Sequence, residues 1–347
     1  MKKSLSRFHK IISRFKDSRI LVLGDIMLDK FIWGTVSRIS PEAPVPVVWS
    51  RSESFMPGGA SNVANSIRVL GAEVYMAGTV GDDEAGRILA AELAKNGIDN
   101  EGIVIDSSRP TTDKMRIIAH HQQVVRVDKE SSGPVGKGVL NKIISFAKKK
   151  IPEVDAVILE DYGKGLMVPR LIKELVKFSK AHKKIIMIDP KEEHVDLYRG
   201  ITAITPNRNE AEEAAGIKIR DVASLKKVGK RLLQKWSSEA VLITLGEDGM
   251  ALFQKKGGFM HIPTVAQQVY DVSGAGDTVI GVFALAKASG AGLIEAAHIS
   301  NVAAGVVVGK LGIASCTQKE LKAHLGQVQR YGTKPKKSSY PSDSIFA

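Results

Sequence analysis

Apolar, β-rich runs alternate with helical segments along most of this chain, and that alternation limits the possible fold more than any other feature. Residues 19–23 form an apolar run that ends in Gly24-Asp25, and residues 61–70 follow with helical spacing up to Gly71. Further strands are predicted at 74–79, 156–159, 184–188, 203–205 and 240–244, and further helices at 83–96, 169–182, 208–216 and 224–236. Such alternation is typical of a doubly wound sheet with helices on both faces. We therefore predict an α/β fold on a mainly parallel sheet.

Two stretches interrupt the alternation. Residues 31–55 have no helical period and contain several prolines, whereas residues 114–129 alternate apolar and polar side chains, as a half-exposed strand does. We expect these segments to form a small antiparallel β lid that covers a site or pairs with a second copy of the chain. Residues 332–347 are rich in Pro, Lys and Ser, so we predict one domain over residues 1–331 and a disordered tail after it.

Composition excludes several classes of protein. The net charge is +13, but aromatic residues are only 5% of the chain and the basic residues are scattered, so we expect no nucleic-acid partner. The single cysteine, Cys316, excludes a disulfide framework and a cysteine-based zinc site, and it fits a reducing, cytoplasmic location. No apolar run reaches the ~20 residues of a membrane span.

The N-terminus has an amphipathic pattern with Leu5, Phe8, Ile12 and Phe15 at helical spacing. This pattern fits a membrane-surface or transit-like helix, or a short helix that packs against the edge of the domain. We favour packing against the domain, and the lack of an apolar core segment argues against a secretory signal.

The sharpest motif is Asp271-Val-Ser-Gly-Ala-Gly-Asp277-Thr278, followed by an apolar helix at residues 279–288. Small residues at Gly274, Ala275 and Gly276 let backbone N–H groups at the helix N-terminus surround an anion such as a phosphoryl group in transfer. Asp277 lies beside this anion hole and can accept a proton from an attacking alcohol. The alternative is that Asp277 merely caps the helix.

Two further motifs follow predicted strands. Asn207 and Glu210 share one face at the start of a helix and can hold hydrated Mg²⁺ against nucleotide phosphates, or they can form a capping box. Thr244, Gly246 and Gly249 allow close approach of a ligand to the backbone, or they form an ordinary β-turn.

The segments Pro57-Gly-Gly59-Ala-Ser-Asn62 and Gly24-Asp-Ile-Met-Leu-Asp29 complete the set. All five motifs lie where predicted strands end, and ligands bind at the carboxyl ends of strands in open α/β sheets. Their joint position favours a functional site over five separate turns and caps.

The order of these motifs resembles the ribokinase-like (PfkB) carbohydrate kinase family, over roughly residues 19–321. The resemblance implies an ATP-dependent kinase that uses Mg²⁺, with room for a monovalent cation, and Asp277 as the base beside the anion hole. It places on the nucleotide side Asn207, Glu210, Thr244, Gly246, Gly249, Asn301 and Lys191. It assigns Asp29, Gly59 and Asn62 to the hydroxyl groups of the sugar.

Three segments are more specific within the family: residues 37–47, Gln122-Gln-Val-Val-Arg126-Val-Asp128 and Glu160-Asp-Tyr-Gly-Lys-Gly165. They resemble the kinase domains that phosphorylate D-glycero-β-D-manno-heptose 7-phosphate at the anomeric hydroxyl in ADP-heptose synthesis for lipopolysaccharide. Many relatives carry a second, nucleotidyltransferase domain, for which this sequence has no room after residue 332, so we expect a stand-alone kinase. Other interpretations are a kinase of fructose 1-phosphate or a nucleoside, and an idle sugar- or nucleotide-binding regulator.

The lid supplies the last expectations. Lys114, Arg116 and Arg126 are candidates to bind the phosphate of the substrate, or they are exposed strand charges. The resemblance also implies a homodimer through the lids, which would cover the apolar side chains Val45, Val47, Ile117 and Val125.

Overall fold

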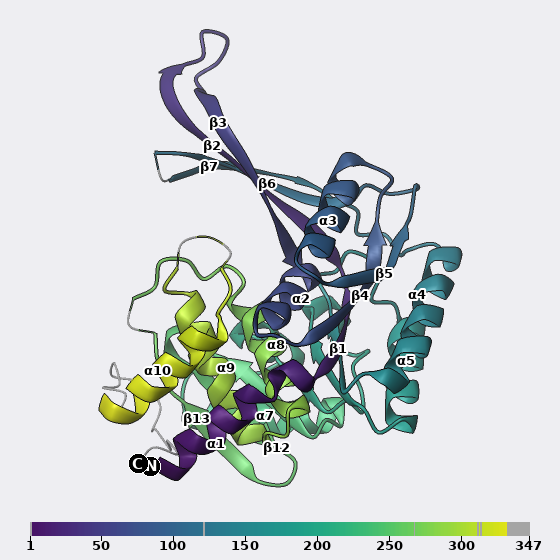
Figure 1. Ribbon diagram of the computed structural model, residues 1–347, viewed down its shortest axis with the longest axis vertical. Helices are drawn as coiled ribbons and strands as arrows, with labels where there is room; N and C mark the ends of the chain where they lie inside the picture. The colour runs from purple at the N-terminus through teal and green to yellow at the C-terminus, as the bar shows by residue number, and fades with distance from the viewer. Residues whose placement is uncertain (1, 121, 267, 311, 313, 332–347) are drawn as a thin grey trace.

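A nine-stranded sheet forms the centre of the computed structural model, which describes residues 2–120, 122–266, 268–310, 312 and 314–331 (Figure 1). The strand order is β13-β12-β11-β10-β9-β8-β1-β4-β5, parallel from β5 to β11, with β12 and β13 antiparallel at one edge. The bounds are β1 Arg19–Gly24, β4 Glu73–Val80, β5 Asp99–Ile105, β8 Ala156–Glu160, β9 Ile185–Asp189, β10 Ala203–Ile204, β11 Ala240–Thr244, β12 Met250–Gln254 and β13 Gly258–Ile262. The predicted α/β class with a mainly parallel sheet is confirmed.

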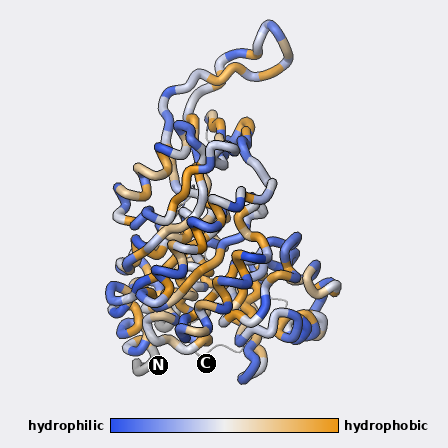
Figure 2. The backbone as a smooth tube through the Cα atoms, turned by 90° about the vertical axis from the view of Figure 1, so that its right-hand side faces the viewer, coloured by the Kyte–Doolittle hydropathy of each residue, from blue (hydrophilic) through white to orange (hydrophobic). Residues whose placement is uncertain are grey.

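Helices cover both faces of this sheet, and strand side chains alternate between two hydrophobic cores. Ile20 and Val22 of β1 join one core, and Leu21 and Leu23 join the other, because successive strand residues point to opposite faces. The first core includes α1 Lys2–Ser13, α2 Ala60–Val69, α3 Glu84–Lys95, α8 Ala275–Ala288, α9 Leu293–Val307 and α10 Gln318–Tyr331. The second includes α4 Lys137–Lys150, α5 Pro169–Ala181, α6 Arg208–Ala215 and α7 Val222–Trp236. Apolar segments of the main domain run through its interior in Figure 2.

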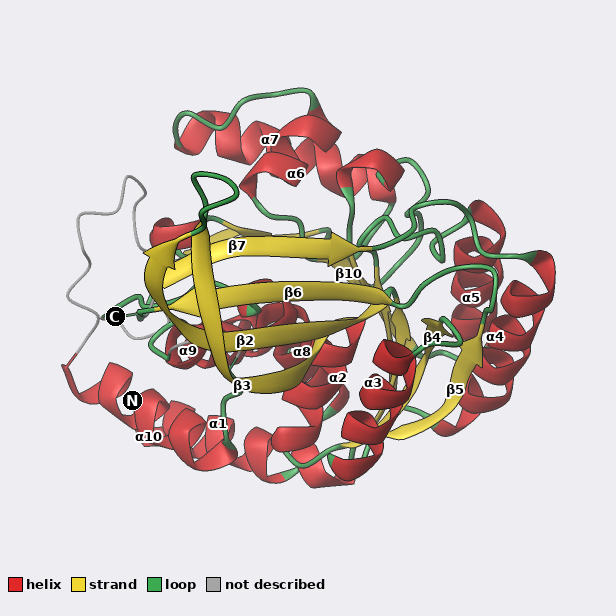
Figure 3. Ribbon diagram, turned by 90° about the horizontal axis from the view of Figure 1, so that it is seen from above, coloured by secondary structure: helices red, strands yellow, loops and turns green. Residues whose placement is uncertain are grey.

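The lid is a second sheet of four strands in the order β3-β2-β6-β7, with bounds β2 Ile26–Ile39, β3 Pro46–Gly59, β6 Thr112–Ala119 and β7 Gln122–Lys129. It projects from the main domain in Figure 1, and Figure 3 looks down on its strands. The two hairpins are antiparallel as predicted, but β2 and β6 pair in parallel, so the lid is a mixed sheet. The lid is directly connected to the main domain, because only one residue separates the lid strand β2 from β1.

The amphipathic N-terminal segment forms α1, whose side chains Phe8, Ile11 and Ile12 are buried in the first core. The prediction that this helix packs against the domain is confirmed. In the part of the chain that the structure describes, no helix has both the length and the apolar character needed to cross a membrane. The predicted tail at 332–347 lies outside the described residues.

Candidate active site

Asp277 lies in the first turn of α8, close to the carboxyl ends of the central strands. Its side chain is 6% exposed and accepts two hydrogen bonds: one from the Tyr162 hydroxyl to Oδ1 at 2.6 Å, and one from Asn62 Nδ2 to Oδ2 at 2.6 Å. Burial raises the pKa of Asp277, and the bonds from Tyr162 and Asn62 oppose that shift. The alternative that Asp277 caps the helix is wrong, because the N-cap residue is Gly274.

The predicted anion hole is the turn that leads into α8. Gly274 has φ +75°, a conformation that glycine adopts without strain, and this turn directs the chain into the helix. Thr278 donates the first helical bond to the Gly274 carbonyl, at 3.0 Å, so the N–H groups of Gly276 and Asp277 precede the helical ladder. The Ala275 N–H, in contrast, donates to the Val272 carbonyl at 3.2 Å. The Gly276 N–H thus lies outside the helical ladder, whereas the Asp277 N–H also interacts with the carboxylate of its own side chain.

The residues predicted for sugar hydroxyls gather on the lid side of Asp277. Asp29 on β2 is 3% exposed, and a Cβ atom built on Gly58 would lie 2.1 Å from its Oδ2, so only glycine fits there. Gly59, with φ +53°, is the N-cap of α2, which carries Asn62 in its first turn. Asn62 Oδ1 is buried and finds no hydrogen-bond partner among the described residues. This atom is therefore available to accept a bond from a ligand hydroxyl.

The three predicted phosphate-binding cations lie around Asp29. Arg116 forms an ion pair with Asp29, and Arg126 lies opposite Arg116 across the β6–β7 pair. Lys114 lies opposite Asp29 across the β2–β6 pair. Burial raises the pKa of Asp29, and the positive charges of Arg116, Lys114 and Arg126 act against the rise. Arg126 also pairs with Asp128 at 2.9 Å. These three cations therefore form one cluster around Asp29 on the lid, in which the Arg126 side chain is 48% exposed.

On the nucleotide side, Asn207 and Glu210 form the capping box of α6. Asn207 Oδ1 accepts from the Glu210 N–H at 3.1 Å, and Glu210 Oε2 accepts from the Asn207 N–H at 2.7 Å. Burial raises the pKa of Glu210 to about 7, and the nearby positive charge of Lys191 partly opposes this rise. The capping alternative is thus confirmed, and each residue keeps further hydrogen-bonding capacity for other contacts.

The other predicted nucleotide residues lie on neighbouring elements. Thr244, the last residue of β11, forms an isolated parallel β-bridge with Asn207, which lies three residues after the end of β10. Gly246 and Gly249 have positive φ angles of +64° and +86°, and a Cβ on Gly249 would lie 2.2 Å from the Ile262 carbonyl. Asn301 on α9 donates to the Pro263 carbonyl at 2.8 Å, so it anchors the segment after β13.

The sequence did not predict roles for three further residues: the buried Glu160, the half-buried Asp189 and the phenol of Tyr162. Oxygens of Glu160, Asp189 and Asp277 all lie within 4.8 Å of one another. Burial, then the negative charge of Glu210, raises the pKa of Asp189 to about 8, and burial followed by the charges of Asp189 and Asp277 raises the pKa of Glu160. Glu160 is the last residue of β8 and Asp189 is the last residue of the neighbouring β9. A carboxylate at the end of each of two predicted strands was the signal in the sequence that could have indicated this group. Tyr162 lines a cavity of about 550 Å³ together with Lys164 and Lys191.

Comparison with known proteins agrees with this geometry. Residues 17–320 match the family described as pfkB family carbohydrate kinase. The chain therefore belongs to this family. Among solved structures, it resembles phosphofructokinase-2 from Escherichia coli with substrates and products, with a TM-score of 0.73 and 16% identity over 90% of this chain and 99% of the other. It also resembles ribokinase from Arabidopsis thaliana complexed with ribose and ATP, with a TM-score of 0.69 and 19% identity over 89% and 98%. These likenesses confirm the ribokinase-like fold.

More similar sequences carry the name bifunctional protein HldE. The protein of that name from Desulfatibacillum aliphaticivorans is 46% identical over 90% of this chain and 64% of its own length. The one from Geobacter metallireducens is 43% identical over 91% of this chain and 64% of its own length. The chain therefore spans just under two thirds of the length of these relatives.

Proposed function

We propose that the protein transfers the γ-phosphoryl group of ATP to the anomeric hydroxyl of D-glycero-β-D-manno-heptose 7-phosphate, giving the 1,7-bisphosphate for ADP-heptose synthesis. One observation carries this proposal: the buried carboxylate of Asp277 lies close enough to Asp29 for the charge of Asp29 to raise its pKa, and the cation cluster of Lys114, Arg116 and Arg126 surrounds Asp29. A sugar that already carries a phosphate suits this combination, and similarity to the HldE relatives favours the seven-carbon sugar.

In this mechanism, Asp277 accepts the proton of the anomeric hydroxyl as its oxygen attacks phosphorus. Asn62 and Tyr162 hold the carboxylate in place through their two hydrogen bonds. The N–H groups in the first turn of α8 donate to the transferring phosphoryl oxygens, where negative charge must be stabilised. Closure of the lid would exclude water and limit wasteful hydrolysis of ATP.

The donor set on the nucleotide side fits Mg²⁺. Carboxylate and amide oxygens are hard ligands, and Mg²⁺ keeps most of its waters, so Asn207 and Glu210 can hold it through water. Burial is the main cause of the raised pKa of Glu210, so a cation nearby would favour the ionised form of this residue. When bound, Mg²⁺ neutralises charge on the nucleotide phosphates. Thr244, Gly246, Gly249, Asn301 and Lys191 would hold the rest of the nucleotide, and a monovalent cation stays a further proposal.

The cation cluster would bind the 7-phosphate. Arg116 and Arg126 can each form paired hydrogen bonds to phosphate oxygens, which a lysine cannot. In the structure, Arg116 pairs with Asp29 and Arg126 pairs with Asp128. Binding of the sugar phosphate would therefore exchange partners within the lid and leave Asp29 available for sugar hydroxyls.

We also propose a homodimer formed through the lids, in the cytoplasm. All eight residues of β7 are exposed, including the large apolar side chains of Val125 and Val127. On the other edge of the lid, Trp49 is 57% exposed, and Val45 beside β3 is 52% exposed. Exposed apolar strand edges are usually covered in native proteins. The lid of a second copy offers apolar surface of the same kind and could cover these side chains. Val47 and Ile117, which were also expected at this interface, are half-buried within the single chain.

The test is release of ADP from ATP in the presence of a panel of sugars: the heptose 7-phosphate, fructose 1-phosphate, fructose 6-phosphate, ribose and a nucleoside. The heptose 7-phosphate should give the highest kcat/KM, and Arg116→Gln should raise the KM for this substrate. A preference for an unphosphorylated sugar would contradict the proposed substrate while retaining the kinase. Binding of sugars without phosphoryl transfer to any of them would indicate an idle regulator.

A further inference from the structure

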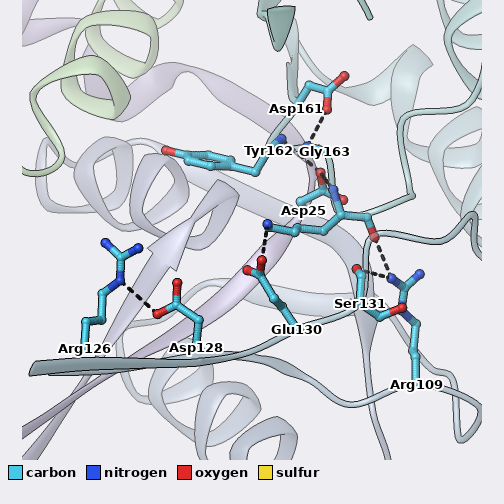
Figure 4. Close-up of polar contacts among 10 residues, drawn as sticks. Asp25, Arg109, Arg126, Asp128, Glu130, Ser131, Asp161, Tyr162 and Gly163 are labelled. Atoms are coloured by element: carbon cyan, nitrogen blue, oxygen red, sulfur yellow. Dashed lines mark hydrogen bonds and ion pairs between the residues drawn. The ribbon is translucent and has the colours of Figure 1, made fainter. Parts of the chain in front are cut away.

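The loop that follows β8, residues 161–168, connects the candidate base to the lid. Its Tyr162 hydroxyl donates to Asp277 Oδ1 at 2.6 Å. The same loop contacts the segments where the second lid hairpin, β6–β7, leaves and re-enters the main domain. Figure 4 shows this junction, with Asp25 and Tyr162 at its centre and Arg109, Glu130 and Ser131 beside them.

Asp25 fixes the backbone of the loop from the main-domain side. This residue lies between β1 and the lid strand β2, is 4% exposed, and accepts from three backbone N–H groups of the loop. The donors are Tyr162 at 2.9 Å, Lys164 at 3.0 Å and Leu166 at 3.3 Å. Three converging bonds define the path of the backbone, and therefore the direction of the Tyr162 side chain.

Arg109 fixes the loop from the lid side. It precedes β6, and its Nη2 donates both to the Lys164 carbonyl at 2.6 Å and to the Ser131 carbonyl at 2.7 Å. Ser131 follows β7, so one guanidinium group joins the entry of the hairpin, its exit and the loop. Lys164 Nζ adds an ion pair with Glu130 at 2.8 Å, in which the side chains are 18% and 32% exposed.

The backbone leaves little freedom at this junction. Gly165 has φ +90°, and a Cβ atom there would lie 1.9 Å from the Gly133 carbonyl. The Val135 N–H donates to the Gly165 carbonyl at 3.0 Å. A rotation of the β6–β7 hairpin about its ends must therefore either break these contacts or move the loop with it.

We propose that Tyr162 is a positioning residue for Asp277, and that Arg109, through the loop at 161–168, makes this position depend on where the lid stands. The proposal rests on the proposed role of Asp277 as the base. When the lid is in place, the phenol holds one carboxylate oxygen and Asn62 holds the other, so the base faces the sugar in one orientation. A displaced lid pulls the loop and weakens the contact, so the base is aligned only when the site is covered.

The first test is a double-mutant cycle on the sugar that the wild type phosphorylates. Tyr162→Phe removes only the hydroxyl, and it should lower kcat about tenfold with little change in the KM for sugar, because misalignment affects the reacting geometry more than binding. Arg109→Gln removes the double clamp and should also lower kcat. If Arg109 acts through Tyr162, Arg109→Gln should cost nothing further when Tyr162→Phe is already present. Losses that multiply would overturn the coupling.

Controls separate positioning from general damage. Tyr75→Phe removes a phenol that donates to Glu73 at the start of β4, and it should leave kcat unchanged. Arg109→Lys keeps the charge but not the two-carbonyl geometry, so it should recover only part of kcat. If Arg109→Gln fails to fold, as judged by circular dichroism, Arg109→Lys takes its place in the cycle.

The second test needs no sugar and separates this proposal from the proposed function. The carboxyl ¹³C signal of Asp277, assigned by its loss in Asp277→Asn, is titrated in the free protein. The groups around Asp277 are Tyr162 and Glu160 from β8 and its loop, Asp189 from β9, Asp29 from β2 and Asn62 from α2. Tyr162→Phe removes a donor to the carboxylate, so the pKa of Asp277 should rise, and Arg109→Gln should move it the same way. An unmoved titration in both variants would overturn the proposal even if the sugar is phosphorylated, and inactivity towards sugars would leave this result valid.

Discussion

Replacement of Asp277 by asparagine separates the chemical role of this residue from its structural role. The amide has the same size as the carboxylate but cannot accept the proton of the sugar hydroxyl. Asp277→Asn should therefore lower kcat by roughly 10²–10⁴-fold, the range that general-base catalysis supplies. Binding of ATP should persist, because the nucleotide contacts come from other elements.

The same substitution should stabilise the fold at neutral pH. The pKa of Asp277 in the folded protein lies above the ordinary value for an aspartate, mainly because the group is buried. The ionised carboxylate thus costs stability above the folded pKa and nothing below the unfolded pKa, and each pH unit between these two values corresponds to about 1.4 kcal/mol. The amide carries no charge and avoids that cost. Its nitrogen can donate to Asn62 Oδ1, which has no hydrogen-bond partner among the described residues, once the Asn62 amide turns over.

The assays are steady-state ADP release and thermal unfolding at pH 4.5 and pH 8. Asp277→Asn should show a higher Tm than the wild type at pH 8, and the difference should shrink at pH 4.5. Asp82→Asn, at an exposed residue in an ion pair with Arg87, is the matched control and should change neither property. Turnover near the wild-type rate would refute Asp277 as the base. Equal Tm differences at both pH values would refute the assigned cost of burial.

Three further predictions concern the metal, the lid, and Asp189 in the group of carboxylates with Glu160 and Asp277. Activity should be lost in EDTA and restored by Mg²⁺, and Glu210→Gln, which can still accept the Asn207 N–H, should need about tenfold more Mg²⁺; an unchanged metal titration would remove Glu210 from the site. The wild type should sediment as a dimer at micromolar concentration, and Val125→Lys should dissociate the dimer and weaken sugar binding. The control Ile105→Lys, at an exposed residue of the main domain, should do neither. A monomeric wild type would refute the lid dimer. Burial raises the pKa of Asp189 to about 8, so the contribution of this residue to stability falls from about pH 4 upward and is lost above about pH 8. Asp189→Asn should therefore raise the Tm of the metal-free protein more at pH 8.5 than at pH 4.5. A larger rise at pH 4.5 would refute the destabilising effect assigned to the ionised carboxylate.

The main sheet could be predicted from the sequence because its strands are buried on both faces. Such strands are short, almost wholly apolar runs, and the helices between them have clear ends, as at Gly71 and Gly97. Strands β5, β12 and β13 were not predicted. They lie at the two edges of the sheet, where the apolar pattern is weaker. The parallel pairing of β2 with β6 was also missed, since it joins segments about 85 residues apart that carry no local signal of direction.

The candidate site was predicted where a motif is local in sequence. Gly274–Asp277 and Asn207–Glu210 each lie within one turn of helix, so their spacing alone suggests shared contacts. The contact of Tyr162 with Asp277 joins residues 115 positions apart, and the grouping of Glu160 with Asp189 depends on β8 and β9 being neighbours. Only the folded arrangement shows these relationships. It also shows that Asn207 and Glu210 form the capping box of α6.

The structure of the reaction product tests phosphoryl transfer to the anomeric hydroxyl most directly. The wild type is incubated with ATP, Mg²⁺ and D-glycero-β-D-manno-heptose 7-phosphate, and the product is followed by ³¹P and ¹³C NMR. The 7-phosphate signal should be retained, and a second phosphate signal should appear with coupling to C1 and H1, with no such signal from Asp277→Asn. A new phosphate on any other carbon, or release of inorganic phosphate without a sugar bisphosphate, would contradict transfer to the anomeric hydroxyl.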